Sequence, residues 1–178
     1  PRMYIERDNR LENDLDKITG LILKDVFFRS DKVASQIKAK YLNPINEAFV
    51  RIFGEDNGTK LTLLALIPPL EEKIADIIFE KGESEVHYNY LGHGEKAVFN
   101  ILINLLVRTS LYQETIYYLD EIDLHLNTKL QYGLLKELVE HWLPDGCQLW
   151  TASHSLGFID YAKQVGHAVI VDFDAFDF

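Results

Sequence analysis

The chain has 178 residues, of which 47% are hydrophobic and 26% charged, a composition typical of a folded domain rather than a disordered segment. The formal net charge of -10 excludes binding to nucleic acid through the overall field, although a local basic patch stays open. The single cysteine, Cys147, excludes an internal disulfide, and without a signal peptide or a long apolar run we expect a cytoplasmic protein with no membrane partner.

The first half of the chain is predicted to be helical and then to form a β-hairpin. Apolar residues recur at three- and four-residue steps near the start, which indicates an amphipathic helix. Capping and turn residues mark the elements that follow. In chain order we expect a helix at 11–26, a helix capped by Ser30 or Asp31, a helix from Pro44 to about Gly54, a strand at 60–67, and a hairpin of 74–80 and 85–91.

The second half alternates between helices and apolar strands. In chain order we expect a helix at 95–109, a strand at 115–119, a helix at 128–142, a strand at 147–151, a short helix after Ser155, and a strand at 168–173. Such alternation predicts a mostly parallel sheet flanked by helices. Because ligands of these sheets bind at the carboxyl ends of the strands, the residues that follow each strand are the candidates for function.

Two adjacent carboxylates, Asp120 and Glu121, follow the first of these strands. At the end of a buried strand one acid can bind a magnesium ion while the other polarises an attacking water molecule. Asp123 and His125 follow in the same loop. The alternative is that the acids are simply part of a solvated loop.

A histidine, His154, follows the next strand in the segment TASHS. It could hydrogen-bond a phosphate oxygen or an attacking water molecule. In the alternative interpretation, Ser153 or Ser155 caps the following helix and His154 is only a turn residue.

A glycine-containing segment, LGHGE at residues 91–95, stands before a predominantly apolar helix. Gly92 and Gly94 would let the backbone approach a ligand, and a helix expected to begin at Glu95 would present unpaired N–H groups to an anion. The helix carries a narrow polar stripe, so we expect it to be buried around most of its girth and rigid. The alternative is a glycine turn that serves only to enter the helix.

Together, and in this order along the chain, the three segments resemble the second half of an ABC-type ATPase head. The similarity is to the branch that contains SMC-like heads and the OLD-family and AAA15/AAA21-like ATPases, and it covers roughly residues 85–174. By this resemblance, the signature loop is Leu91, Gly92, His93, Gly94 and Glu95, the Walker B strand ends at Asp120 and Glu121, the D-loop is Leu124, His125, Leu126 and Asn127, and the switch histidine is His154.

The resemblance implies the fold and the chemistry. The fold would be the C-terminal lobe of a P-loop NTPase of the ABC type at residues 59–178, preceded by a helical segment at 1–58. ATP and Mg²⁺ would be the cofactors: Asp120 would help to hold Mg²⁺, Glu121 would orient or deprotonate the hydrolytic water, and His154 would contact the γ-phosphate. The signature loop would cap ATP held by a second copy, so the active form would be a homodimer.

Several residues depart from the family pattern. No glycine is followed by lysine, so the P-loop motif GxxxxGK[ST] is missing, and Gln36 is the only glutamine before the signature loop. The chain would therefore hydrolyse ATP only together with a Walker A lobe, and we expect it to be a fragment of a longer protein. Gly92 replaces the usual serine, His93 a glycine, and Asn127 the usual aspartate, changes that favour the OLD-like branch.

The sequence is compatible with several biological roles and with two alternative functions. The family associates such heads with DNA repair or with anti-phage defence through a nuclease or toxin effector, and DNA itself is a candidate partner. A low-turnover, ATP-dependent assembly or sensor module is one alternative. A TOPRIM-like, magnesium-dependent nuclease built from Glu121, Asp172 and Asp174 is another. The six histidines match no standard zinc-ligand spacing.

Overall fold

The computed structural model describes residues 10–28, 34–56, 58–67, 76–109, 114–120 and 125–172. The chain forms two compact units, Pro1–Gln113 and Glu114–Phe178. The predicted division into a helical segment at 1–58 and an ATPase lobe at 59–178 is a different kind of boundary and stays a prediction. The caps expected at Ser30 and Asp31 lie outside the described residues.

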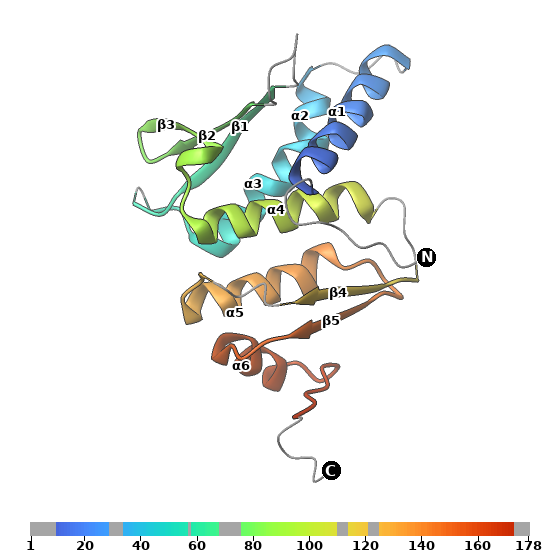
Figure 1. Ribbon diagram of the computed structural model, residues 1–178, viewed down its shortest axis with the longest axis vertical. Coiled ribbons are helices and arrows are strands. Elements are labelled where there is room, and N and C mark those ends of the chain that lie inside the picture. Colours follow the sequence, from blue (N-terminus) through green and yellow to red (C-terminus); the bar gives the residue numbers. More distant parts are fainter. Residues whose placement is uncertain are drawn as a thin grey trace. The chain divides into compact units, whose positions relative to one another are not determined.

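Helices and a small antiparallel sheet make up the first unit (Figure 1). Its described elements are α1 (Arg10–Phe28), α2 (Ala34–Tyr41), α3 (Asn43–Phe53), β1 (Leu61–Ile67), β2 (Asp76–Lys81), β3 (Ser84–His87), the 3₁₀ turn η1 (Tyr88–Tyr90) and α4 (His93–Arg108). The strands lie in the order β1-β2-β3. The predicted helices, the strand and the hairpin of this half are therefore confirmed.

The hairpin differs from the prediction at its end. Lys81 pairs with Ser84, so the turn has two residues, and its positive φ of 63° falls on Gly82, where glycine is favoured. The second strand was expected to run to residue 91, but β3 ends at His87 and η1 follows. The backbone curls because the N–H of Leu91 donates to Tyr88 O at 3.1 Å.

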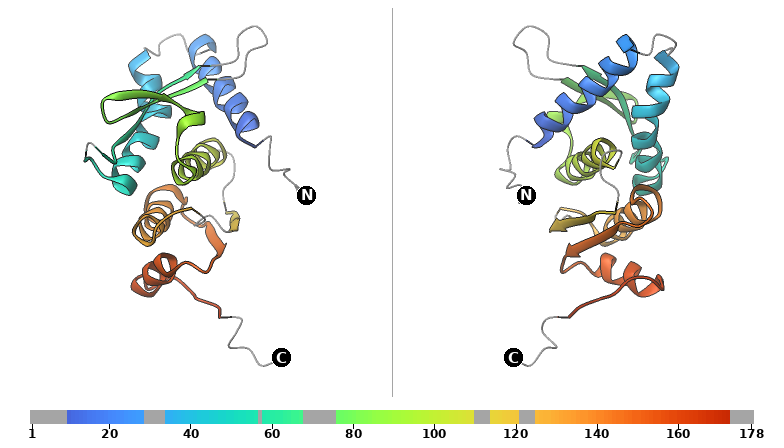
Figure 2. Two further views of the ribbon diagram at one scale, coloured as in Figure 1. Left: turned by 60° about the vertical axis from the view of Figure 1, so that its left-hand side comes forward. Right: turned by 90° about the vertical axis from the view of Figure 1, so that its right-hand side faces the viewer.

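The core of the first unit is aromatic at its centre. Phe79 of β2 packs on one side against Phe49 of α3, with ring centroids 6.3 Å apart. On the other side it meets Phe99 of α4 edge to face, at 5.2 Å. All three side chains are fully buried. The views of Figure 2 show α4 nearly end-on and flanked by α1 and α3, so the helix that follows the glycine loop is fixed on several sides.

An asparagine of α3 holds the irregular part of β1. The register of β1 against β2 shifts between Leu63 and Ala65. At this bulge Asn46 Oδ1 accepts from the N–H of Leu63 at 2.6 Å, and Asn46 Nδ2 donates to Leu63 O at 3.1 Å. One side chain thus satisfies both backbone groups of a strand residue.

We expect Asn46→Ala to lower the free energy of unfolding by about 2–6 kcal/mol, because two part-buried backbone groups lose their partner at about 1–3 kcal/mol each. Asn46→Asp keeps the acceptor for the N–H of Leu63 but sets a carboxylate oxygen against Leu63 O, so it should also lower stability. Urea denaturation monitored by circular dichroism measures both. Equal stability of Asn46→Ala and the wild type would contradict this role.

The second unit alternates strand and helix as predicted (Figure 1). Its described elements are β4 (Ile116–Asp120), α5 (Thr128–Glu137), the π-helical turn η2 (Leu138–Trp142), β5 (Gln148–Ala152) and α6 (Leu156–Gln164). β4 and β5 are parallel, with Ile116 opposite Gln148 and Asp120 opposite Ala152. The parallel pairing of the two strands is thus confirmed.

We expected a strand at 168–173, and for residues 168–172 this prediction is wrong. Residue 173 lies outside the described residues. Residues 168–172 form no strand, and Val169, Ile170 and Val171 are exposed. Apolar character alone does not make a strand, because a strand also needs a neighbour for its backbone hydrogen bonds. The expected helix at 128–142 is present, but its last turn is π-helical.

The two faces of the β4–β5 pair differ. Leu149 packs with the helices on a cluster of Leu135, Phe158 and Tyr161. Burial raises the pKa of Tyr161 to about 12, so its hydroxyl stays protonated and donates to Glu140 Oε1 at 3.3 Å. On the other face the large side chains are 57–63% exposed; they are Ile116, Tyr118 and Trp150. Parallel sheets are normally covered on both faces.

Candidate functional site

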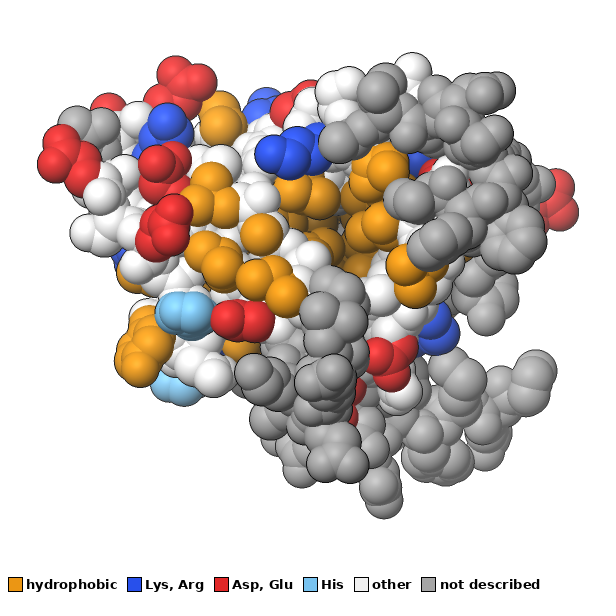
Figure 3. Space-filling model, turned by 90° about the horizontal axis from the view of Figure 1, so that it is seen from above, with side chains coloured by type: hydrophobic (Ala, Val, Ile, Leu, Met, Phe, Trp, Pro, Cys, Tyr) orange, Lys and Arg blue, Asp and Glu red, His pale blue; other side chains and the backbone are white. Residues whose placement is uncertain are grey.

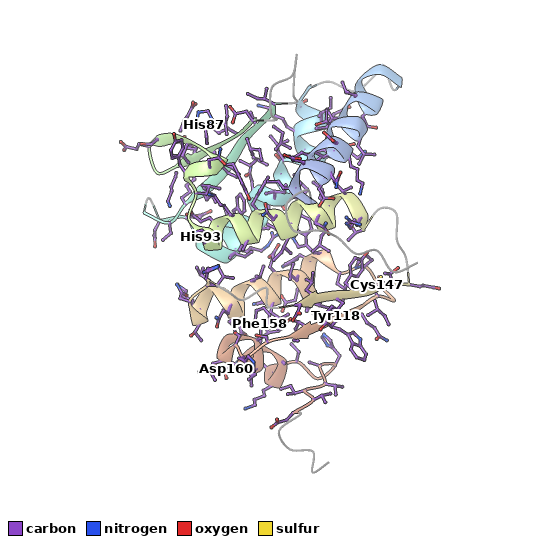
Figure 4. The ribbon with its side chains drawn as sticks, in the orientation of Figure 1. His87, His93, Tyr118, Cys147, Phe158 and Asp160 are labelled. Carbon is purple, nitrogen blue, oxygen red and sulfur yellow. The ribbon has the colours of Figure 1, made fainter. Side chains whose placement is uncertain are left out.

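The predicted signature loop, Leu91–Glu95, leads into the first turn of α4. Leu91 is buried, Gly92 is the N-cap residue, and His93 is exposed at the start of the helix, where Figure 4 labels it. The helix begins at His93 and not at Glu95 as expected. A glycine loop at the amino end of a well-packed helix is therefore confirmed, two residues earlier than predicted.

The side chain of Glu95 binds the backbone of its own loop and a lysine of β2. Its Oε2 accepts from the N–H of Gly92 at 2.8 Å, and its Oε1 lies 2.8 Å from Lys81 Nζ. The carboxylate thus uses one of the N–H groups at the helix terminus, and the lysine of β2 balances its charge. An anion bound at this helix terminus would therefore have the remaining N–H groups available, because the N–H of Gly92 already donates to Glu95.

The backbone at Gly92 does not itself require glycine. Its φ of −64° and ψ of 156° are accessible to any residue. A Cβ added there would meet Glu95 Oε2 at 3.3 Å, which is the end of a flexible side chain. The backbone conformation thus gives no reason for glycine at position 92.

The polar stripe of α4 contacts its own unit rather than solvent. Asn104 Nδ2 donates to Asp14 Oδ2 of α1 at 2.6 Å, and Arg108 Nη2 lies 3.5 Å from Asp14 Oδ1. At the other end, Tyr88 donates to Asn100 Oδ1 at 3.0 Å, and burial raises the pKa of this phenol, which keeps it a donor. The expected burial of α4 is confirmed, and polar contacts hold the helix to its own unit at both ends.

Asp120 and His154 follow neighbouring parallel strands. Asp120 is the last residue of β4, opposite Ala152 at the end of β5, and His154 comes two residues later. Both side chains are exposed. Because the two strand ends coincide, the carboxylate and the imidazole lie at the same edge of the sheet, as predicted. Glu121, Asp123 and Leu124 lie outside the described residues.

Residues 125–127 form the entry to α5. His125 adopts a positive φ of 69°, Leu126 is buried, and Asn127 Oδ1 accepts from the N–H of Leu130 at 3.0 Å as the N-cap of the helix. Asparagine and aspartate are about equally good in this position. Asn127 therefore provides the N-cap of α5 as well as an aspartate would.

Ser155 caps α6, as one of the two interpretations of this segment predicted. Its Oγ accepts from the N–H of Phe158 at 3.1 Å, and Ser153 Oγ accepts from the N–H of Ser155 at 2.9 Å. His154 is thus held between two serines that fix the local backbone. A capping serine and a functional histidine are compatible, so this geometry leaves the role of His154 a prediction.

Gln131 and Gly157 connect the two candidate segments of the second unit, and neither was predicted from the sequence. Gln131 Nε2 donates to Leu126 O at 3.0 Å, and Ser155 Oγ donates to Gln131 Oε1 at 2.7 Å. A Cβ added to Gly157 would lie 2.4 Å from Thr128 O, so the first turns of α5 and α6 touch through their backbones. A glycine in the first turn of a helix was the only sign of this contact in the sequence.

The candidate residues are divided between the two units. Leu91–Glu95 lies in the first unit, and Asp120, His125–Asn127 and His154 lie in the second. In the described part of the chain, no three His, Cys, Asp or Glu side chains gather as a metal site. Asp172 of the nuclease alternative is exposed, and Asp174 lies outside the described residues. Searched over the same part of the chain, no helix combines the length and apolar character needed to cross a bilayer.

The second unit thus places an acid and a histidine at the carboxyl ends of two neighbouring parallel strands, where α/β sheets bind ligands. Among solved structures, a chain from work on ATP-driven dimerization and DNA-stimulated activation of SMC ATPases matches 78% of this chain over 78% of its own length, with 18% identity and a TM-score of 0.50. The Smc head bound to the C-terminal winged-helix domain of ScpA matches 87% of this chain, with 17% identity and a TM-score of 0.56.

The chain is therefore similar in fold to the heads of SMC ATPases, and the predicted α/β fold class is confirmed. It spans 46% of the length of the ScpA-bound head. No protein-family model matches the sequence, and no curated protein matches it.

Proposed function

We propose that the chain is the signature-bearing part of an ABC-type ATPase head that binds Mg-ATP between two copies and hydrolyses it. The observation that carries the proposal is the shared position of Asp120 and His154 at the ends of paired parallel strands, in a chain with the fold of SMC ATPase heads. The rigid helix behind the loop 91–95 supports it, because a helix terminus offers N–H groups and a favourable dipole to a phosphate.

Each candidate residue has a defined task in this proposal. Asp120 is an exposed carboxylate that fits one ligand position of a magnesium ion, which commonly takes one or two carboxylates and completes its shell with phosphate oxygens and water. The ion would neutralise charge on the phosphates. Glu121 orients and deprotonates the attacking water, and His154 donates to the γ-phosphate. Gly92 to Glu95 cap the nucleotide of the second copy.

The P-loop has to come from a further lobe, either on the same polypeptide or on a separate one. The sequence contains no GxxxxGK[ST] motif. The exposed apolar face of the β4–β5 pair, with Ile116, Tyr118 and Trp150, is the surface on which we propose that this lobe packs.

We also propose which branch of these ATPases the chain resembles most and which process it serves. Gly92 and Asn127 in place of the usual signature serine and D-loop aspartate favour the OLD-like branch, whose heads drive a nuclease or toxin effector in DNA repair or anti-phage defence. On the face shown in Figure 3, acidic and basic side chains are interspersed with exposed hydrophobic ones. If DNA is the partner, the net charge of -10 favours a local site over binding through the overall field.

Two substitutions at Gly92 test the composite site. Aspartate is a good N-cap and should preserve α4, but it adds a carboxylate where the γ-phosphate of the second copy is expected. With about 1.5–3 kcal/mol lost at each of two pockets, we expect Gly92→Asp to weaken ATP-induced dimerisation at least about 100-fold. Analytical ultracentrifugation of the complete protein with Mg-ATP measures this.

Gly92→Ser is the matched control. It adds a similar Cβ, close only to the flexible carboxylate of Glu95, and it restores the hydroxyl usual in the family. ATP-induced dimerisation should stay within about threefold of the wild type, since serine is also a good N-cap. Dimerisation of Gly92→Asp at wild-type strength would show that the loop 91–95 does not contact ATP.

A further inference from the structure

A single amide side chain connects two segments of the second unit that the proposed function treats separately. Gln131 lies on α5, and its Nε2 and Oε1 reach Leu126 O and Ser155 Oγ at 3.0 and 2.7 Å. Leu126 belongs to the turn 125–127, and Ser155 follows His154 directly. In sequence the two segments are far apart, with α5, η2 and β5 between them.

Hydrogen-bond chemistry fixes the orientation of this amide. A backbone carbonyl can only accept, so the NH₂ group of Gln131 has to face Leu126 O. The carbonyl oxygen of Gln131 then faces Ser155, whose hydroxyl donates to it and also accepts from the N–H of Phe158. The result is one directed chain from the first turn of α6 to the turn 125–127, and such chains strengthen each member by polarisation.

The two helices leave Gln131 little freedom. A Cβ on Gly157 would lie 2.8 Å from Gln131 Cβ and 2.8 Å from Tyr132 N, which means that the first turn of α6 lies directly on α5 at this residue. Ser155 is buried, with 4% exposure, so its hydroxyl depends on Gln131 as an acceptor. A movement of the turn 125–127 would therefore be passed to the segment around His154.

We propose that Gln131 is a positioning residue that keeps the turn 125–127 and the His154 segment in one arrangement. This inference rests on the proposed function, in which His154 contacts the γ-phosphate. The Gln131 amide holds Ser155, the residue next to His154, and is itself held by the carbonyl of Leu126. The position of His154 during hydrolysis then depends on the Gln131 amide.

Gln131→Ala tests the inference in the complete protein. We expect kcat for ATP hydrolysis to fall about tenfold, while KM for ATP and ATP-induced dimerisation stay within about twofold, because geometry is lost without the loss of a binding contact. Hydrogen exchange should show lower protection in two peptides at once, the one that contains residues 125–127 and the one that contains residues 153–155. Gln131→Glu is a second variant. It still accepts a hydrogen bond from Ser155 but cannot donate one to Leu126 O, so only the peptide that contains residues 125–127 should lose protection.

Gln164→Ala is the matched control, because Gln164 accepts a hydrogen bond from Tyr132 between the same two helices but away from both segments. It should change kcat by less than about twofold. If the wild type hydrolyses ATP and Gln131→Ala behaves like Gln164→Ala, the coupling role is wrong and the proposed function stands. If the complete wild-type protein neither binds nor hydrolyses ATP, the proposed function fails first, and the inference fails with it.

Discussion

Replacing Glu121 with glutamine should lower ATP turnover of the complete protein by roughly 10²- to 10⁴-fold, the usual contribution of a general base. Glutamine keeps the size of the side chain but cannot take a proton, so ATP-induced association should persist. Steady-state ATPase assays and ultracentrifugation on the same preparation measure both properties. A loss of turnover of this size with retained association is the pattern expected of a hydrolytic base, whereas the positioning variant Gln131→Ala should lose only about tenfold.

The matched control is Glu114→Gln. Glu114 is an exposed glutamate just before β4, whereas Glu121 follows the other end of the strand, so the two variants remove the same charge at opposite ends. Glu114→Gln should hydrolyse ATP at the wild-type rate.

The same assays separate the alternatives. Normal hydrolysis by Glu121→Gln would remove Glu121 from the mechanism. A wild type that associates with ATP but scarcely turns it over would favour the sensor module. Magnesium-dependent DNA cleavage that needs Glu121 but not ATP would favour the TOPRIM-like nuclease.

Gly157→Ala should destabilise the second unit by about 2–4 kcal/mol, a large effect for one methyl group. The added Cβ would lie 2.4 Å from Thr128 O and 2.8 Å from Tyr132 N. Both are backbone atoms of α5, which cannot move aside without separating the two helices. The same separation would break the contact of Gln131 with Ser155, so hydrolysis should fall as well.

Gly166→Ala provides the comparison for this prediction. No atom lies within 4 Å of a Cβ at Gly166, and the change should alter stability by less than about 0.5 kcal/mol. Both tryptophans, Trp142 and Trp150, belong to the second unit, so their fluorescence in urea reports on this unit directly. Equal midpoints for Gly157→Ala and Gly166→Ala would show that α5 and α6 can separate without cost.

Local features of the chain were predictable because they depend on residues close together in sequence. The three- and four-residue spacing from Leu11 onwards gave α1, Pro44 and Gly54 marked the ends of α3, and the segment KGES at 81–84 marked the hairpin, whose turn is shorter than expected. The alternation of strands and helices also indicated the parallel pair β4–β5, since parallel neighbours need a crossover between them.

By itself the sequence determined the order of the main helices and strands and placed Asp120 and His154 at the ends of two neighbouring parallel strands. Only the tertiary structure decided that residues 168–172 form no strand, and that Asn46 and Gln131 hold backbone groups far away along the chain. The physical reason is that periodicity and capping are local properties, whereas the partner of a buried amide and the space around a glycine depend on how distant segments pack.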